Sequence, residues 1–139
     1  MKKYINNGDG TITDRVTGLM WKRCCEGQEW KRSGKAFTGE TGEYTYEQAM
    51  SLKSDFAGHS DWRMPTIDEL KTIIKSRKSS SKKPCINRKV FPDNPNLVWS
   101  SSPYLGNPSL AQFVRFSYGD VFSNYRHNTF AVRLVRMVK

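Results

Sequence analysis

The sequence predicts an α+β domain, with strands in its first and last thirds and two helices between them. Short runs of β-forming residues, separated by glycine-containing turns, fill both ends of the chain. The middle carries two helix-start signatures, each a threonine followed three residues later by Gln or Glu. Strands, then helices, then strands is an order typical of α+β folds. A length of 139 residues fits a single domain over residues 1–139 with a buried core.

The N-terminal part predicts two short strands, Thr11–Thr13 and Leu19–Trp21, each preceded by a tight turn. Three glycines in these turns suit backbone positions with positive φ: Gly8, Gly10 and Gly18. Asp9 and Asp14 are interpreted as turn-forming residues, because the ligand spacing of an EF-hand calcium loop is absent.

The middle of the chain predicts a loop and then the two helices. Residues 26–44 are polar, contain glycine and show no period, which predicts a long surface loop. Thr45 with Gln48 marks the first helix start, and Thr66 with Glu69 marks the second. The apolar residues at helical spacing are Tyr46, Ala49, Met50 and Phe56 after the first start, and Ile67, Leu70, Ile73 and Ile74 after the second.

The last third predicts strands at Val98–Ser100, Gln112–Phe116 and Val121–Phe122. A final strand is predicted over Phe130–Arg136. Because this run is apolar on both faces, we expect it to be a central strand rather than an edge strand.

The charge of the chain indicates an anionic partner. Lysine and arginine number 23 against 13 acidic residues, a formal net charge of +10. Such a charge attracts nucleic acid, anionic lipid or acidic glycans, although a merely solubilising surface has the same composition. The excess concentrates between Lys71 and Lys89, which contain no acidic residue. The predicted anion-binding residues are Lys75, Arg77, Lys78, Lys82, Lys83, Arg88 and Lys89. The alternative interpretation of this stretch is a solvated loop.

Seven motifs follow one another in an order that resembles a known family. They are Asn7–Asp14, Thr17–Trp21, Asp61–Thr66, Glu69–Leu70, Val90–Pro92, Trp99–Ser102 and Val132–Arg136. Together they resemble the C-terminal domain of bacterial collagen-like adhesins of the Lcl type, over essentially the whole chain. The resemblance implies a C-type-lectin-like fold, related to that of formylglycine-generating enzymes, with two helices packed on short antiparallel strands and long loops. It also implies a surface or secreted binding module. The adhesin that gives the family its name is a trimer that binds sulfated glycosaminoglycans.

The resemblance also assigns roles to residues of this chain. In this fold type the loops before the last strand form the binding face, and here they carry Tyr118, Asp120, Asn124, Tyr125, Arg126, His127 and Asn128. An ordinary polar hairpin is the alternative for this segment. The residues expected to be structural are the core tryptophans Trp21, Trp62 and Trp99 and the arginines Arg63, Arg133 and Arg136, with Asp61 and Glu69 as ion-pair partners.

The cysteines and the remaining motifs argue against an enzyme. An odd number of cysteines leaves at least one thiol unpaired, and Cys24 or Cys25 with Cys85 is the internal disulfide that the spacing leaves open. No CxxC pair suggests a metal site, and no phosphate-binding loop, dinucleotide fingerprint or nucleophile elbow is present. We therefore expect no metal, no cofactor and no catalysis; a cysteine-dependent oxidase is the weakest alternative.

The sequence thus predicts a module that binds an acidic glycan or another polyanion. The alternative is a protein-binding domain of a phage, secretion-system or host-directed kind. We expect no sequence-specific nucleic-acid binding, because no recognised reading motif occurs, and no membrane span. The resemblance to a trimeric adhesin implies a homo-oligomer. Two locations stay open: the cell surface or outside if a leader was removed, and the cytoplasm if Met1 is the native start.

Overall fold

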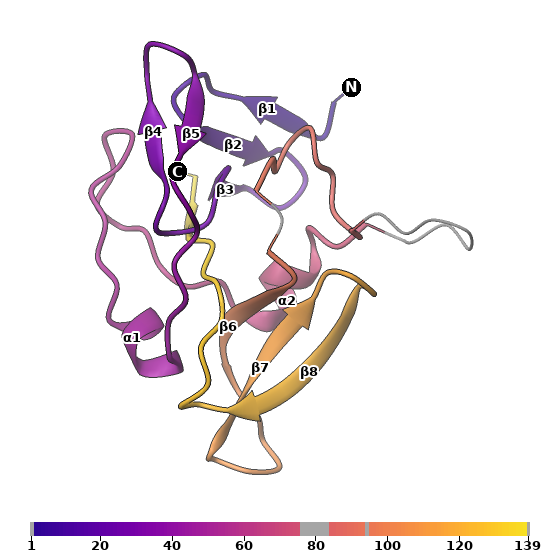
Figure 1. Cartoon of the computed structure of the whole chain (residues 1–139). Helices are drawn as coiled ribbons and strands as arrows, with labels where there is room; N and C mark the ends of the chain where they lie inside the picture. The colour runs from indigo at the N-terminus through magenta and orange to yellow at the C-terminus, as the bar shows by residue number, and fades with distance from the viewer. Residues whose placement is uncertain (1, 76–83, 94, 139) are drawn as a thin grey trace.

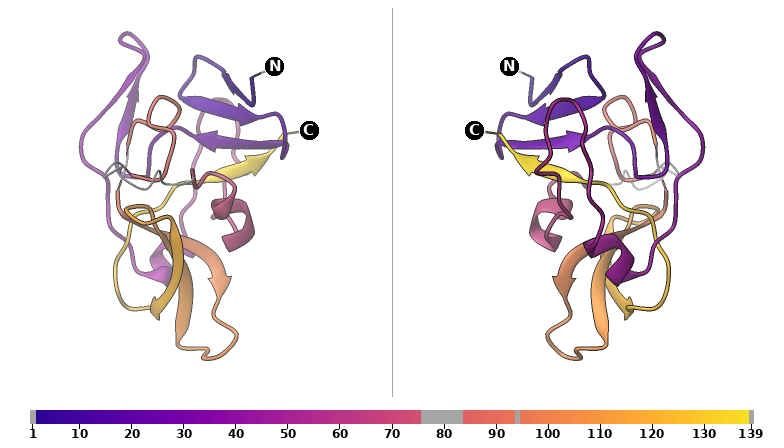
Figure 2. Two further views of the ribbon diagram at one scale, coloured as in Figure 1. Left: turned by 90° about the vertical axis from the view of Figure 1, so that its right-hand side faces the viewer. Right: turned by 90° about the vertical axis from the view of Figure 1, so that its left-hand side faces the viewer.

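The computed structural model describes residues 2–75, 84–93 and 95–138. Within them the chain forms three antiparallel sheets and two short helices, which confirms the predicted α+β class. The four-stranded sheet lies at one end and the three-stranded sheet at the other, with helix α2 (Ile67–Lys71) between them (Figure 1). The two side views in Figure 2 show the same division.

The four-stranded sheet holds both ends of the chain. Its order is β1-β2-β3-β9, with bounds β1 Tyr4–Asn6, β2 Thr11–Asp14, β3 Leu19–Lys22 and β9 Val135–Met137. The two strands predicted from residues 11–13 and 19–21 are confirmed, and β1 is an additional one. Asp9 accepts hydrogen bonds from the Thr11 amide and hydroxyl, and Asp14 accepts from the Val16 amide, so both aspartates form turns as expected.

A small hairpin occupies the region predicted as a long surface loop, so that prediction for residues 26–44 is wrong. β4 (Glu29–Lys31) pairs antiparallel with β5 (Ala36–Thr38). Trp30 and Phe37 are partners in this register, and their ring centroids lie 5.0 Å apart. The polar composition hid the hairpin, because each strand has three residues and only one large apolar side chain.

The first helix, α1 (Tyr46–Met50), begins at the predicted capping box. The Thr45 hydroxyl accepts from the Gln48 amide at 3.2 Å, and the Gln48 side chain accepts from the Thr45 amide at 2.9 Å. The helix ends after Met50, so Phe56 lies outside it, in a turn where its backbone bonds to His59.

The second helix, α2 (Ile67–Lys71), also begins as predicted. Thr66 and Glu69 exchange the two hydrogen bonds of a capping box. The Glu69 carboxylate also accepts two hydrogen bonds from the Arg63 guanidinium, at 2.7 and 2.8 Å, so Glu69, one of the two carboxylates expected to pair with an arginine, pairs with Arg63. Ile73 follows the helix rather than belonging to it, but it is buried as its position in the apolar stripe predicts.

The Arg63–Glu69 pair makes stability depend on pH. The hydrogen bonds from Arg63 hold the pKa of the Glu69 carboxyl below its usual 4.5, against the opposing effect of burial. Because the pKa is lower in the folded state, the pair stabilises the fold above about pH 4.5, and this contribution is lost as the pH falls through the depressed pKa. We expect Glu69→Gln to cost about 1 kcal/mol at pH 7 and close to nothing near pH 3, measured by urea unfolding across this range.

Glutamine keeps the capping oxygen and removes only the charge, so the pH dependence isolates the ion pair. Glu40→Gln is the matched control, because Glu40 is exposed and forms no ion pair among the described residues. A Glu69→Gln deficit that persists unchanged at low pH would contradict this assignment.

The three-stranded sheet has the order β6-β7-β8. Its bounds are β6 Leu97–Pro103, β7 Leu110–Arg115 and β8 Asp120–Tyr125, so the three strands predicted in this region are confirmed and each is longer than expected. β8 is an edge strand, paired on one side with β7.

The last segment is buried as predicted, but it is not one central strand. Every residue from Phe130 to Arg136 is buried, yet only β9 pairs as a strand, with β3. The preceding residues cross between the sheets through single bridges, Tyr44 with Phe130 and Val98 with Ala131. An apolar run with no polar face is therefore explained here by a chain that passes between two packed clusters.

Most of the residues predicted to be structural are buried and packed or hydrogen-bonded. Trp21 and Trp99 are fully buried and Trp62 is nearly so, and each lies in one of the two core clusters. Arg133 is 1% exposed, and its guanidinium donates to the carbonyl oxygens of Lys22, Arg23 and Asp93. Arg136 donates to Asp61, at 2.6 Å from its Nε. These arginines hold chain segments together.

Candidate functional site

A backbone hydrogen bond joins Lys75 to Cys85, which flank residues 76–83 of the basic stretch, and we call this junction the neck. The Lys75 amide donates to the Cys85 carbonyl at 2.7 Å, and the Cys85 amide donates to the Phe116 carbonyl at 2.7 Å. Lys75 and Cys85 therefore lie beside the turn between β7 and β8. Gly119 confirms this proximity, since a Cβ built there would lie 3.1 Å from the Cys85 Cβ.

Three of the predicted anion-binding cations are described, and all three are exposed: Lys75, Arg88 and Lys89. Among the described residues no carboxylate lies within ion-pair distance of them. Arg23 lies behind the turn that carries Arg88 and Lys89, because its guanidinium donates to the carbonyls of Lys89 and Val90. The other predicted cations lie outside the described residues: Arg77, Lys78, Lys82 and Lys83.

Tyr118 and Asp120 lie at the neck as well. Arg115 donates two hydrogen bonds to the Asp120 carboxylate, at 3.1 and 2.8 Å, and its guanidinium lies 4.2 Å from the centre of the Tyr118 ring. The hydrogen bonds from Arg115 lower the pKa of Asp120, so this carboxylate stays ionised and its charge is balanced by that of Arg115. Tyr118 is 64% exposed. We call Lys75, Arg88, Lys89 and Tyr118 together the basic end.

The rest of the predicted binding face lies at the opposite end of β8. The strand has six residues, which separates Asp120 from Tyr125 by roughly 17 Å at the usual rise. Figure 1 shows β8 running away from the side where α2 and the 84–93 segment lie. Residues 117–128 therefore form two separate surfaces rather than one face. We call the second, made of Asn124, Tyr125, Arg126, His127 and Asn128, the far end.

Side chains of the far end are organised by contacts among themselves. The Tyr125 and His127 rings stack with centroids 5.6 Å apart. The Asn124 side chain accepts from the Tyr125 amide and from the Asn128 side chain, both at 2.8 Å. Arg126 lies over the Tyr46 ring at 4.8 Å, which ties this surface to α1.

The three cysteines are free and buried, so neither disulfide left open by the sequence is formed. Burial raises the pKa of the Cys24 thiol to about 11 and that of Cys25 to about 12. Both thiols are therefore protonated near neutral pH, the form that is a poor nucleophile and a poor metal ligand.

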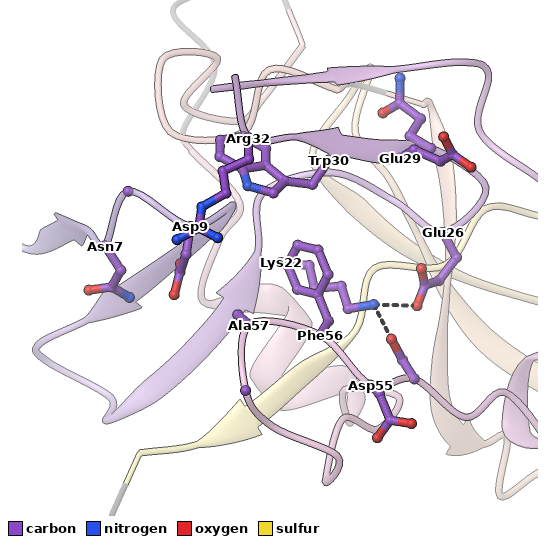
Figure 3. Close-up of a pocket in the computed structure, with 14 residues that line it drawn as sticks. Asn7, Asp9, Lys22, Glu26, Glu29, Trp30, Arg32, Asp55, Phe56 and Ala57 are labelled. Atoms are coloured by element: carbon purple, nitrogen blue, oxygen red, sulfur yellow. Dashed lines mark hydrogen bonds and ion pairs between the residues drawn. The ribbon is translucent and has the colours of Figure 1, made fainter. Parts of the chain in front are cut away.

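The structure also has an open cleft of about 950 Å³ that the sequence did not predict. Figure 3 shows Lys22 at its floor, Asp9 and Arg32 on one side, and Glu26 and Asp55 on another. The sequence did not predict the cleft because one of its walls is the β4–β5 hairpin, in a region predicted to be a loop. The signal that could have found it is the pair Trp30 and Phe37, whose spacing across a glycine-containing turn is typical of a hairpin.

The described residues contain neither a candidate metal site nor a candidate membrane-spanning helix. No group of three or more His, Cys, Asp or Glu side chains is placed to hold a metal ion in this part of the chain. None of the described helices has the length and apolarity needed to cross a bilayer.

Fold and site together define a small α+β domain with exposed charged loops mounted on an aromatic core. The family model of the Lcl C-terminal domain matches residues 10–136. The chain therefore belongs to this family, as the order of its motifs indicated. A comparison with curated proteins found no match.

Proposed function

We propose that the chain is a non-catalytic binding module that recognises an acidic glycan or another polyanion through its basic end. The observation that carries this proposal is that Lys75, Arg88 and Lys89 are exposed and have no ion-pair partner among the described residues. Each can form a charge-assisted hydrogen bond to a sulfate or carboxylate group. Because Arg115 pairs with Asp120, the charge of this carboxylate beside Tyr118 is balanced.

Membership of the Lcl C-terminal domain family supports a binding role of the adhesin type. The fold we propose is C-type-lectin-like. The first and last strands share one sheet, and a separate antiparallel sheet with long connections presents the exposed loops. Fold alone does not fix a ligand, so the proposal for the ligand depends on the charges of the basic end.

The absence of catalysis is part of the same proposal. The nucleophile candidates Cys24 and Cys25 are buried with raised pKa values, and among the described residues neither bonds to a histidine. A cysteine-dependent reaction needs an accessible thiolate, usually beside a base.

Heparin affinity chromatography tests the proposed ligand class. We expect the protein to bind heparin resin at low salt and to elute as NaCl rises, since screening weakens attraction between charges. Replacing Lys75, Arg88 and Lys89 together with alanine should lower the NaCl concentration needed for elution by at least a third, because a large share of the contacts is lost. Passage of the unaltered protein straight through the resin at low salt would refute the proposal.

A matched control separates the effect of the basic end on heparin binding from the effect of the overall net charge. Replacing Arg15, Lys35 and Lys53 with alanine removes the same three charges from exposed positions in other loops. We expect this variant to elute close to the unaltered protein. If both triple variants elute at the same reduced salt, attraction depends on overall charge and the basic end is not the site.

The far end favours protein recognition as a second function. Tyr125 is 52% exposed and pairs with Leu110, whose carbonyl accepts from the Tyr104 amide, so the exposed Tyr104 and Leu105 lie beside it. An exposed group of aromatic and aliphatic side chains is typical of protein-binding surfaces. If this surface acts independently, Tyr125→Ala should leave heparin elution unchanged.

A further inference from the structure

The cleft has chemistry unlike that of the basic end. On a protein with a net charge of +10, its lining includes four carboxylates and two cations. The carboxylates belong to Asp9, Glu26, Glu29 and Asp55, and the cations to Lys22 and Arg32. A polyanion has no reason to enter a cleft with this lining, so its ligand must differ from that of the basic end.

The floor of the cleft is a buried ammonium group. Lys22 is 5% exposed, and its Nζ donates to Glu26 at 2.9 Å and to Ser54 at 2.5 Å. The same nitrogen lies 4.7 Å from the centre of the Phe56 ring and 5.5 Å from that of Trp62. Figure 3 shows this amine held between Glu26 and the segment that carries Asp55. An ammonium group has three N–H donors, and Glu26 and Ser54 accept two of them.

The walls are aromatic and rigidly packed. Trp30 contacts Phe37, and the Phe37 and Phe56 rings stack with centroids 6.5 Å apart. Gly10 lies against all three rings, since a Cβ built there would come within 3.2 Å of each. Trp30 and Phe56 line the cleft, so it combines apolar ring surface with polar groups at its floor and rim.

Three of the six charged groups that line the cleft are paired within the protein. Lys22 pairs with Glu26, and Glu29 pairs with Lys31 at 3.0 Å. This leaves Asp9, Asp55 and Arg32 at the rim, two carboxylates and one guanidinium with a net charge of −1. Such a rim repels a strong anion, and its acceptors and donors can exchange hydrogen bonds with hydroxyl groups, which both donate and accept.

We infer that this cleft binds an uncharged sugar unit. The carbon-bound hydrogens on one face of a sugar ring pack on an aromatic side chain, here Trp30, which buries apolar surface on both partners. Its hydroxyl groups accept from the ammonium of Lys22 or the guanidinium of Arg32 and donate to the carboxylates of Asp9 or Asp55. The cleft volume of about 950 Å³ accommodates one or two such rings. This site is separate from the basic end and does not depend on the function proposed for it.

Saturation-transfer NMR tests the inference with neutral hexasaccharides of glucose, xylose, mannose and N-acetylglucosamine. The measurements are made in 0.5 M NaCl, where attraction between exposed charges is largely screened. We expect at least one of these sugars to receive saturation at its ring hydrogens. Trp30→Ala and Asp55→Asn should each weaken that binding at least tenfold, while Leu105→Ala, at a remote and 98% exposed position, should leave it unchanged.

Asp55 is exposed and no described contact holds it, so Asp55→Asn keeps the test valid if loss of Trp30 disturbs the hairpin. No saturation transfer to any of the four sugars overturns the inference, and so does binding that neither variant weakens. Saturable binding of spermidine in place of a sugar would identify the cleft as a cation site and would also overturn it. Heparin elution of Asp55→Asn stays that of the unaltered protein, which separates this result from the test of the basic end.

Discussion

Replacing Arg133 with methionine should lower the free energy of unfolding by about 3–5 kcal/mol. The guanidinium donates to three backbone carbonyls, those of Lys22, Arg23 and Asp93, from a side chain that is 1% exposed. Methionine fills much of the volume but offers no donor, so these carbonyls lose their partner, at a cost of about 1–3 kcal/mol for each buried group. Because domains of this size are stable by about 5–15 kcal/mol, urea unfolding should show a much lower midpoint.

Arg15→Met is the control for this substitution. Arg15 is exposed in the turn between β2 and β3, and its side chain bonds to no described residue. Its replacement should change the free energy of unfolding by less than about 0.5 kcal/mol. If Arg133→Met unfolds at the same urea concentration as Arg15→Met, the three carbonyl contacts do not stabilise the fold.

Gly10→Ala should cost about 2–4 kcal/mol for two separate reasons. Gly10 has a φ of +89°, a conformation that strains residues with a Cβ by about 1–2 kcal/mol. A Cβ here would also lie 2.8 Å from the Phe56 ring and 3.1 Å from Trp30, so the aromatic wall of the cleft must shift, at about 1–3 kcal/mol. Thermal unfolding followed by near-ultraviolet circular dichroism would report both the stability and the packing of these rings.

Gly8→Ala separates the two causes. Gly8 has a similar φ of +79°, but a Cβ there meets no atom within 4 Å. It should therefore cost only the backbone strain, about 1–2 kcal/mol, and leave the aromatic signal unchanged. Equal losses of stability in the two variants would show that Gly10 is required for its backbone conformation alone.

The helices could be predicted because their signals are local. Each capping box uses residues three apart, and the same side chains then form the bonds that the sequence indicated, as with Thr66 and Glu69. The pairing of Glu69 with Arg63 and of Asp61 with Arg136 was also predictable, since a buried or half-buried arginine needs an acceptor.

The elements that could not be predicted depend on contacts between distant segments. The β4–β5 hairpin packs Phe37 against Phe56, and this contact has no periodic signal in the sequence. The last segment was predicted to be one strand because residues 130–136 are nearly all apolar. In the structure its buried apolar residues belong to two different core clusters. Burial was therefore predictable, and pairing was not.

The residues predicted to form one binding face lie on two surfaces for a related reason. Polar and aromatic residues between 117 and 128 are close in sequence, but β8 extends through them and carries Tyr118 and Tyr125 to opposite ends. The hydrogen bonds from Lys75 to Cys85 and from Cys85 to Phe116 bring Lys75 to the Tyr118 end of β8. Composition predicted the charge of the basic end, and only the hydrogen bonds at the neck locate it.

The most direct test of the basic end is an NMR titration of ¹⁵N-labelled protein with a sulfated heparin hexasaccharide. If the basic end binds the polyanion, amide shifts should change most for Lys75, Arg88, Lys89 and Tyr118, and these changes should diminish as NaCl rises. Shifts confined to Tyr125–Asn128, or no shifts at low salt, would contradict it.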